Sequence, residues 1–279
     1  MSTSVAVGAL FAELIDDAGL FPPAKLPMRE AVAAHLATRS GAYAPLVGRF
    51  LVPNTRIAEF KAALPSGHAP FIRTGVIGDD GLGNLKETLQ WEQDSGFEIE
   101  LIEIPTASSE PDDVATMAIR MYGYFGDRDI FVELPRTSGW IDYLETNLST
   151  LKRSGLGAKF RTGGVVAEAF PSEAQVAAFI AAAVNADVPF KLTAGLHNAL
   201  RHTDPTTGFE HHGFLNVALA VAEPDRAESW LAERDGATVA AAVRTIDAAL
   251  VRSRWRAFGS CSIDEPVDDL IALGLMERA

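Results

Sequence analysis

The chain has 279 residues, of which 48% are hydrophobic and 22% are charged, and this suits one globular domain with a large core. Its formal net charge of −13 argues against nucleic-acid binding, because a phosphate backbone requires a basic face and no run of Lys or Arg supplies one. The single cysteine, Cys261, excludes an internal disulfide and any cysteine-based zinc site.

The first 17 residues contain an apolar stretch that acidic residues interrupt at Glu13, Asp16 and Asp17. The segment lacks the basic start of a signal peptide and the length of a membrane span, so we expect a cytoplasmic protein with no membrane partner. Its pattern predicts a leading helix over 4–17 that closes the bottom of the fold.

Beyond this segment, short apolar runs alternate with stretches of helical periodicity. The runs predict strands over 19–22, 46–52, 71–77, 98–104, 129–134, 158–162, 189–194 and 256–261. The stretches between them predict helices over 28–38, 54–64, 83–94, 111–124, 140–152, 172–185 and 234–252. Short polar side chains that can accept the free amide hydrogens of a first helical turn are the expected N-caps, at Asn54, Ser172 and Asp264.

Eight strands that alternate with helices favour a single (β/α)8 TIM barrel over residues 1–279. A doubly wound open sheet is the alternative, but no GxGxxG follows the first strand, no P-loop occurs and no composition break marks a second domain. The one long connection, 198–213, follows the seventh strand, and loops of that length in compact domains are usually functional or mobile.

Two lysines stand out among the polar residues near the carboxyl ends of the strands, where barrel enzymes build their active sites. Lys159 and Lys191 each lie inside an apolar strand. Burial and a neighbouring cation both disfavour an ammonium group, and a lysine that is neutral near physiological pH can attack a carbonyl to form a Schiff base. The alternative is that a lysine points outward between helices or forms a structural ion pair with Glu100 or Glu133.

Three strand segments carry a family resemblance: AKFRTGG in the sixth strand, FKLTAGLH in the seventh and RAFGSCSI in the eighth. They resemble the deoxyribose-phosphate aldolase group of class I aldolases, which has a Schiff-base lysine in a K-x-x-T-G setting, a second lysine on the next strand and an F-G-x-S-S type phosphate loop. The segments EIELIEI and IFVEL are similar to that group's acidic fourth strand and glutamate-ended fifth strand.

The resemblance implies a role for each polar residue of these strands. Lys159 would be the nucleophile, Lys191 would lower its pKa, and Glu100 would replace the family's strand-four aspartate in proton transfer. Glu133 is the second candidate for that proton transfer, and Arg161 stands where the family has small residues.

Glycines and small polar residues after the last three strands predict an anion site. Glycine lets backbone approach a ligand closely, and a helix N-terminus presents free amide donors. The residues expected to bind the phosphate or carboxylate of a substrate are Arg161, Thr162, Gly163, Gly164, Thr193, Gly195, His197, Arg201, Gly259, Ser260 and Ser262. The alternative is that the glycines only form tight turns between strands and helices.

Two metal sites are weighed as alternatives. Histidine ligands could come from His197, His202, His211 and His212, although no H-E-x-x-H or facial-triad spacing is present. Carboxylates faced by a lysine would resemble enolase-like barrels that hold magnesium, and the candidates are Asp79 or Asp80, Glu103 and Glu133. That arrangement requires Glu103 rather than Glu100 to point inward, because the two lie on opposite faces of a regular strand.

The leading interpretation is a carbon–carbon lyase of aldolase type that forms a Schiff base at Lys159 with a small phosphorylated or carboxylated carbonyl metabolite. This chemistry requires no cofactor. A metal-dependent enolase-like isomerase or dehydratase is the competing class, and a barrel that binds a metabolite without turnover is the third. Because barrels often pair, a homo-oligomer is a further expectation.

Overall fold

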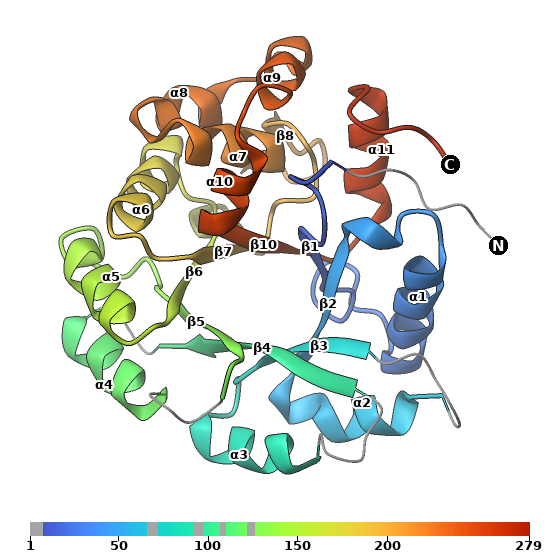
Figure 1. Ribbon diagram of the computed structural model, residues 1–279, viewed down its shortest axis with the longest axis vertical. Helices are drawn as coiled ribbons and strands as arrows, with labels where there is room; N and C mark the ends of the chain where they lie inside the picture. Colours follow the sequence, from blue (N-terminus) through green and yellow to red (C-terminus); the bar gives the residue numbers. More distant parts are fainter. Residues whose placement is uncertain (1–7, 66–71, 92–96, 107–109, 122–125) are drawn as a thin grey trace.

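Eight parallel strands close into a barrel in the order β1-β10-β7-β6-β5-β4-β3-β2, and helices surround it (Figure 1). The computed structural model describes residues 8–65, 72–91, 97–106, 110–121 and 126–279. The barrel strands are β1 (Ile15–Asp17), β2 (Val47–Pro53), β3 (Ile72–Ile77), β4 (Phe97–Pro105), β5 (Asp129–Glu133), β6 (Gly157–Arg161), β7 (Phe190–Thr193) and β10 (Trp255–Ser260). The predicted (β/α)8 barrel is therefore confirmed.

The outer layer consists of helices that pack against the strands. They are α1 (Met28–Ser40), α2 (Ile57–Ala63), α3 (Leu82–Trp91), α4 (Pro111–Met121), α5 (Leu144–Arg153), α6 (Glu173–Asn185), α7 (Phe214–Ala222), α8 (Ala227–Ala232), α9 (Gly236–Val243), α10 (Ala248–Arg254) and α11 (Asp264–Ala272). A small antiparallel hairpin, β8 (His202–Thr203) and β9 (Glu210–His211), lies outside the barrel sheet. Among the helices of the described ranges, none has both the length and the apolar character needed to cross a bilayer.

Alternation along β6 separates an apolar outer face from a charged inner face. Phe160 belongs to the core between barrel and helices, and its ring stacks on Phe179 of α6 with centroids 4.5 Å apart. Lys159 precedes it and points to the other side of the strand, into the barrel. Part of the interior is apolar, where a small separate cluster is formed by Ala18, Leu51, Leu101 and Phe131. Buried charged side chains, among them Lys159 and Lys191, occupy another part of the interior.

The first strand differs from its prediction. Residues 8–14 form turns, 15–17 form β1, and 4–7 lie outside the described residues, so the predicted leading helix is wrong over the described part. The predicted strand 19–22 lies in the turn that follows β1. The physical reason is that Asp16 and Asp17 are both buried, and each finds a partner on a different side of the strand: Lys191 for Asp16 and His35 for Asp17.

The connection between the hairpin and β10 contains more helices than predicted. The expected helix 234–252 is two helices, because Asp247 accepts a hydrogen bond from the amide of Leu250 and starts α10. The helices α7 and α8 were not predicted. In α7 all but the last residue are buried, so the sequence lacks the polar face by which an amphipathic helix is recognised.

Of the three expected N-caps, one is confirmed. Ser172 accepts the amide of Gln175, and the Gln175 side chain accepts the amide of Ser172 in return, which completes a capping box. Asn54 instead donates to Asp80 and accepts from Thr88 through its side chain. Asp264 is the first residue of α11 rather than its cap.

Candidate active site

The two strand lysines meet inside the barrel. Lys159 on β6 and Lys191 on β7 are direct partners in the register of neighbouring parallel strands. Both are buried, with 4% and 0% of their surfaces exposed. The same register places them at one height in the barrel interior. The two lysines therefore converge inside the barrel, a point that the sequence left undecided.

Four carboxylate contacts surround the two ammonium groups. Glu103 on β4 lies between them, with Oε2 2.5 Å from Nζ of Lys159 and Oε1 2.7 Å from Nζ of Lys191. Asp16 on β1 is 2.5 Å from Nζ of Lys191 through Oδ2, and Glu133 at the end of β5 is 2.9 Å from Nζ of Lys159 through Oε2. Two ammonium groups therefore face three carboxylates in a buried cluster.

The electrostatics of the cluster reverse one expectation. Burial disfavours the ammonium group of Lys159, but Glu103 and Glu133 outweigh burial and raise its pKa above the ordinary value. Burial likewise opposes the charge of Glu103, yet Lys159 and Lys191 lower its pKa to about 2. The predicted lowering of the pKa of Lys159 by Lys191 is therefore wrong, because the carboxylate of Glu103 lies between the two cations.

Glu100 does not belong to the lysine cluster, which corrects its predicted part in proton transfer. Its carboxylate contacts Nε of Arg73 at 2.5 Å and Nε of Arg49 at 3.1 Å. Arg49 and Arg73 lie near the starts of β2 and β3, so this second cluster lies nearer the amino ends of the strands than the lysine cluster. The β3–β4 ladder skips Glu100, since Thr74 pairs with Ile99 and Gly75 with Leu101, and this irregularity lets Glu100 and Glu103 serve different clusters.

Asp16 is the member of the site that the sequence interpretation missed. Its second oxygen, Oδ1, accepts the backbone amide of Arg49 at 2.8 Å, which fixes the carboxylate toward Lys191. The signal in the sequence was an acidic pair directly after the apolar Leu14 and Ile15, which is unusual for a solvent-facing segment. The sequence pattern instead predicted that both carboxylates end a leading helix over 4–17.

The loops after β6 and β7 approach each other backbone to backbone. A Cβ atom on Gly163 would lie 2.9 Å from Cε1 of Phe170 and 3.0 Å from Cα of Gly195, so a side chain has no room there. Gly195 also has a φ of +76°, which favours glycine. Thr162 donates from its hydroxyl to the carbonyl of Ala194 at 2.5 Å. These residues have a structural task, whatever they bind.

The end of β10 is held by hydrogen bonds of its own. The buried hydroxyl of Ser260 donates to the carbonyl of Ser262 at 2.6 Å, and the Ser262 hydroxyl accepts the amide of Glu265 at 3.3 Å. His197 contacts this turn, with Nδ1 3.3 Å from the Ser260 hydroxyl and 3.3 Å from Oε2 of Glu265. Burial lowers the pKa of His197 although Glu265 opposes that shift. Gly259 lies beside Leu51 and Thr193 at the barrel interior.

Arg201 is not available to an incoming anion, which corrects its expected place among the substrate-binding residues. Its guanidinium is buried and pairs through Nη2 with Glu173 at 2.6 Å and with Glu210 at 3.0 Å. Glu210 belongs to β9, so Arg201 attaches the hairpin to the start of α6. The long connection 198–213 is thus anchored, and it contains regular structure that the sequence did not predict.

The residues proposed for a metal site are occupied by other partners. Asp79 accepts hydrogen bonds from the amide and hydroxyl of Thr55, and Asp80 accepts from Asn54 and Asn84. Buried His212 contacts the carbonyl of Pro171 through Nε2. Within the described ranges, no group of three or more His, Cys, Asp or Glu side chains has an arrangement suited to a metal ion.

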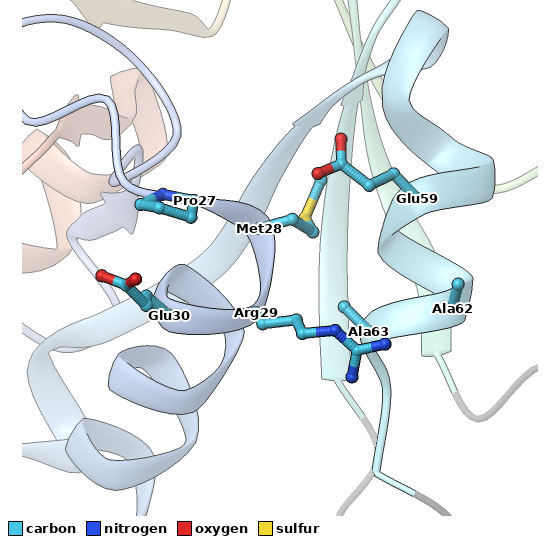
Figure 2. A pocket seen from close by; sticks show the side chains of 7 residues that line it. All are labelled: Pro27, Met28, Arg29, Glu30, Glu59, Ala62 and Ala63. Carbon is cyan, nitrogen blue, oxygen red and sulfur yellow. The ribbon is translucent and has the colours of Figure 1, made fainter.

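A groove on the outer surface is separate from the lysines. It lies between the start of α1 and α2, has a volume of 360 Å³, and is lined by Met28 and Arg29 on one side and by Glu59 and Ala63 on the other (Figure 2). Glu59 already pairs with Arg56 at 2.8 Å. The groove therefore offers mixed polar and apolar walls without a buried reactive group.

Comparison of the chain with models of protein families, with curated proteins and with solved structures gives no match.

Proposed function

We propose that this barrel is a lyase of aldolase type in which Lys159 forms a Schiff base with a small carbonyl compound that carries a phosphate or carboxylate. The observation that carries the proposal is the buried pair of register partners, Lys159 and Lys191, which share Glu103. Burying charged groups is costly, and hydrophobic residues of similar volume would fill a barrel interior at least as stably. A chemical role accounts for that cost.

Lys159 is the better nucleophile of the two. It lies beside Glu133, which ends β5 at the carboxyl opening of the barrel, whereas Lys191 is fully buried between Asp16 and Glu103. Lys191 therefore acts as a positioning residue that holds Glu103 against Lys159.

The charge of the cluster suits the covalent product. The ammonium of Lys159 transfers one proton to a neighbouring carboxylate, and the free amine attacks the carbonyl carbon. The carbonyl oxygen then leaves as water after taking up protons, and an iminium remains on Nζ. Ammonium and iminium carry the same single positive charge. The carboxylates of Glu103 and Glu133 that raise the pKa of Lys159 also stabilise the iminium.

Carbon–carbon cleavage from such an iminium needs one proton acceptor and one proton donor. A carboxylate removes the proton of the substrate's hydroxyl group, the bond electrons move to the iminium to form an enamine, and a protonated carboxyl returns the proton to the enamine carbon. Glu133 and Glu103 are both in contact with Nζ of Lys159 and are suited to these steps.

The test is reduction of the imine with borohydride in the presence of small aldehydes and ketones, followed by peptide mass spectrometry. We expect the adduct on Lys159, its loss in Lys159→Met, and slower formation in Lys191→Met. Lys152→Met is the matched control, because Lys152 lies at the surface in an ion pair with Asp187. Adducts that appear on surface lysines alone, with Lys159 unmodified, would overturn the proposal.

A further inference from the structure

Arg161 stands directly above the proposed nucleophile. It follows Lys159 by two residues on β6, so both side chains lie on the same face of the strand, about 7 Å apart along it. Arg161 is nearer the carboxyl end of β6, and 51% of its side chain is exposed, against 5% for Lys159. A ligand that enters the barrel toward Lys159 therefore passes the guanidinium of Arg161.

The guanidinium of Arg161 is not committed to a protein partner. Within the part of the chain that the structure describes, its only ion pair joins Nη1 to Oε1 of Glu133 at 4.0 Å, and it has no hydrogen bond. Arg201, in contrast, lies 2.6 Å from Glu173 and is buried. Arg161 can therefore accept a new anionic partner without giving up a close one.

The cluster below Arg161 makes such a cation necessary for an anionic substrate. The carboxylates of Asp16, Glu103 and Glu133 exceed the two ammonium groups by one charge. An anion that approaches Lys159 is repelled by this excess unless another cation compensates it. Arg161 supplies that compensation.

The contacts of Glu133 show that the gap between Lys159 and Arg161 has the size of one carboxylate. Its single carboxylate reaches Nζ of Lys159 at 2.9 Å with one oxygen and Nη1 of Arg161 at 4.0 Å with the other. When the carbonyl carbon of a substrate is bonded to Nζ, a carboxylate on that same carbon lies at a similar short distance from Nζ, within reach of the guanidinium. A phosphate that is separated from the carbonyl by further carbons would lie farther from Nζ than this gap between Lys159 and Arg161 allows.

We infer that Arg161 binds the carboxylate of a 2-oxo acid and thereby selects this class of substrate for Lys159. The planar guanidinium can form two parallel hydrogen bonds to a carboxylate, which a lysine at this position could not do. The inference rests on the proposed Schiff base at Lys159 and narrows its substrate to compounds in which the carboxylate adjoins the reacting carbonyl.

The experiment compares borohydride trapping of three aldehydes of equal carbon number: glyoxylate with a carboxylate, glycolaldehyde without a charge, and glycolaldehyde phosphate. Each is tested on the wild type, on Arg161→Leu and Arg161→Gln, and on Arg153→Leu as control, because Arg153 ends α5 and precedes β6 at its other end. Intrinsic aldehyde reactivity cancels when the rate of adduct formation in each variant is divided by the wild-type rate for the same aldehyde.

We expect both Arg161 variants to lower glyoxylate trapping at Lys159 by about 10- to 100-fold, the effect of losing a charge-assisted hydrogen-bonded pair. Glycolaldehyde should change by less than about threefold, and Arg153→Leu should match the wild type for all three aldehydes. An equal loss for glyoxylate and glycolaldehyde, or a larger loss for the phosphate, would overturn the inference. Trapping of glycolaldehyde at Lys159 would then still support the Schiff base, whereas no adduct with any aldehyde would overturn the proposed function itself.

Discussion

Replacing Glu103 by Gln tests the central ion cluster most directly. Glutamine keeps the size of the side chain but removes the charge that lies between the two buried ammonium groups, at 2.5 Å from Lys159 and 2.7 Å from Lys191. Asp16 and Glu133 remain, so each lysine keeps one carboxylate and loses another.

The expected magnitude follows from two independent arguments. Removing one partner of a buried ion pair costs about 3–5 kcal/mol, because an uncompensated charge stays buried. The lowering of the pKa of Glu103 from 4.5 to about 2 corresponds to about 3 kcal/mol of stability near neutral pH. We therefore expect Glu103→Gln to reduce the free energy of unfolding by about 3 kcal/mol.

The assay is urea unfolding near neutral pH, followed by circular dichroism. Glu59→Gln is the matched control, since it removes a surface ion pair with Arg56 in which the Glu59 side chain is 52% exposed, and this should cost less than about 1 kcal/mol. Trace amine labelling across pH provides a second readout, in which the pKa of Lys159 should fall in Glu103→Gln.

The refuting result is equally specific. If Glu103→Gln destabilises no more than Glu59→Gln and the pKa of Lys159 does not move, Glu103 does not bridge the lysines. A double variant, Glu103→Gln with Lys159→Met, separates charge from packing, because it should recover part of the loss if the uncompensated ammonium is the cause.

The free energy of unfolding should decrease as the pH falls from 4.5 toward 2, because the pKa of Glu103 is lower in the folded chain and the unfolded chain binds the proton more readily. A circular dichroism signal that stays constant over this range would contradict this prediction. Arg201→Leu should cost about 2 kcal/mol and speed amide exchange in β8 and β9, since Glu173 and Glu210 lose the cation that joins them, and unchanged exchange would count against this anchoring role. Gly163→Ala should lower stability by about 1–3 kcal/mol, because its methyl group would meet Phe170 at 2.9 Å, and a wild-type melting temperature would show that the loop can move aside.

The sequence was sufficient for most of the barrel, because an apolar run between turns is a strong signal for a strand buried on its outer face. Strand β6 was predicted over 158–162 and lies at Gly157–Arg161, and α6 was predicted over 172–185 and lies at Glu173–Asn185. Strand β1 was not predicted, because two of its three residues are carboxylates. Their buried partners, Lys191 and His35, are distant in the sequence.

The lysines of the site could be predicted, but their charge partners could not. A single lysine within an apolar strand indicates a functional or structural role for that lysine, and this pattern is visible in a few neighbouring residues. The choice between Glu100 and Glu103 depends on one irregularity in the β3–β4 ladder, which no pattern within β4 indicates. Arg201 was assigned to the site from its position after β7, whereas its buried partners, Glu173 and Glu210, decide its role.

The shortness of β1 has a consequence for how the chain reaches its final form during synthesis. Ile15 lies between Val47 of β2 and Phe258 of β10, so the barrel is closed by two strands that are far apart in the sequence. On the ribosome, the three residues of β1 must wait until Phe258 and its neighbours have emerged before their second partner strand exists. The ring can therefore close only after β10 has been synthesised, and a product truncated before β10 would leave the sheet open between β1 and β7.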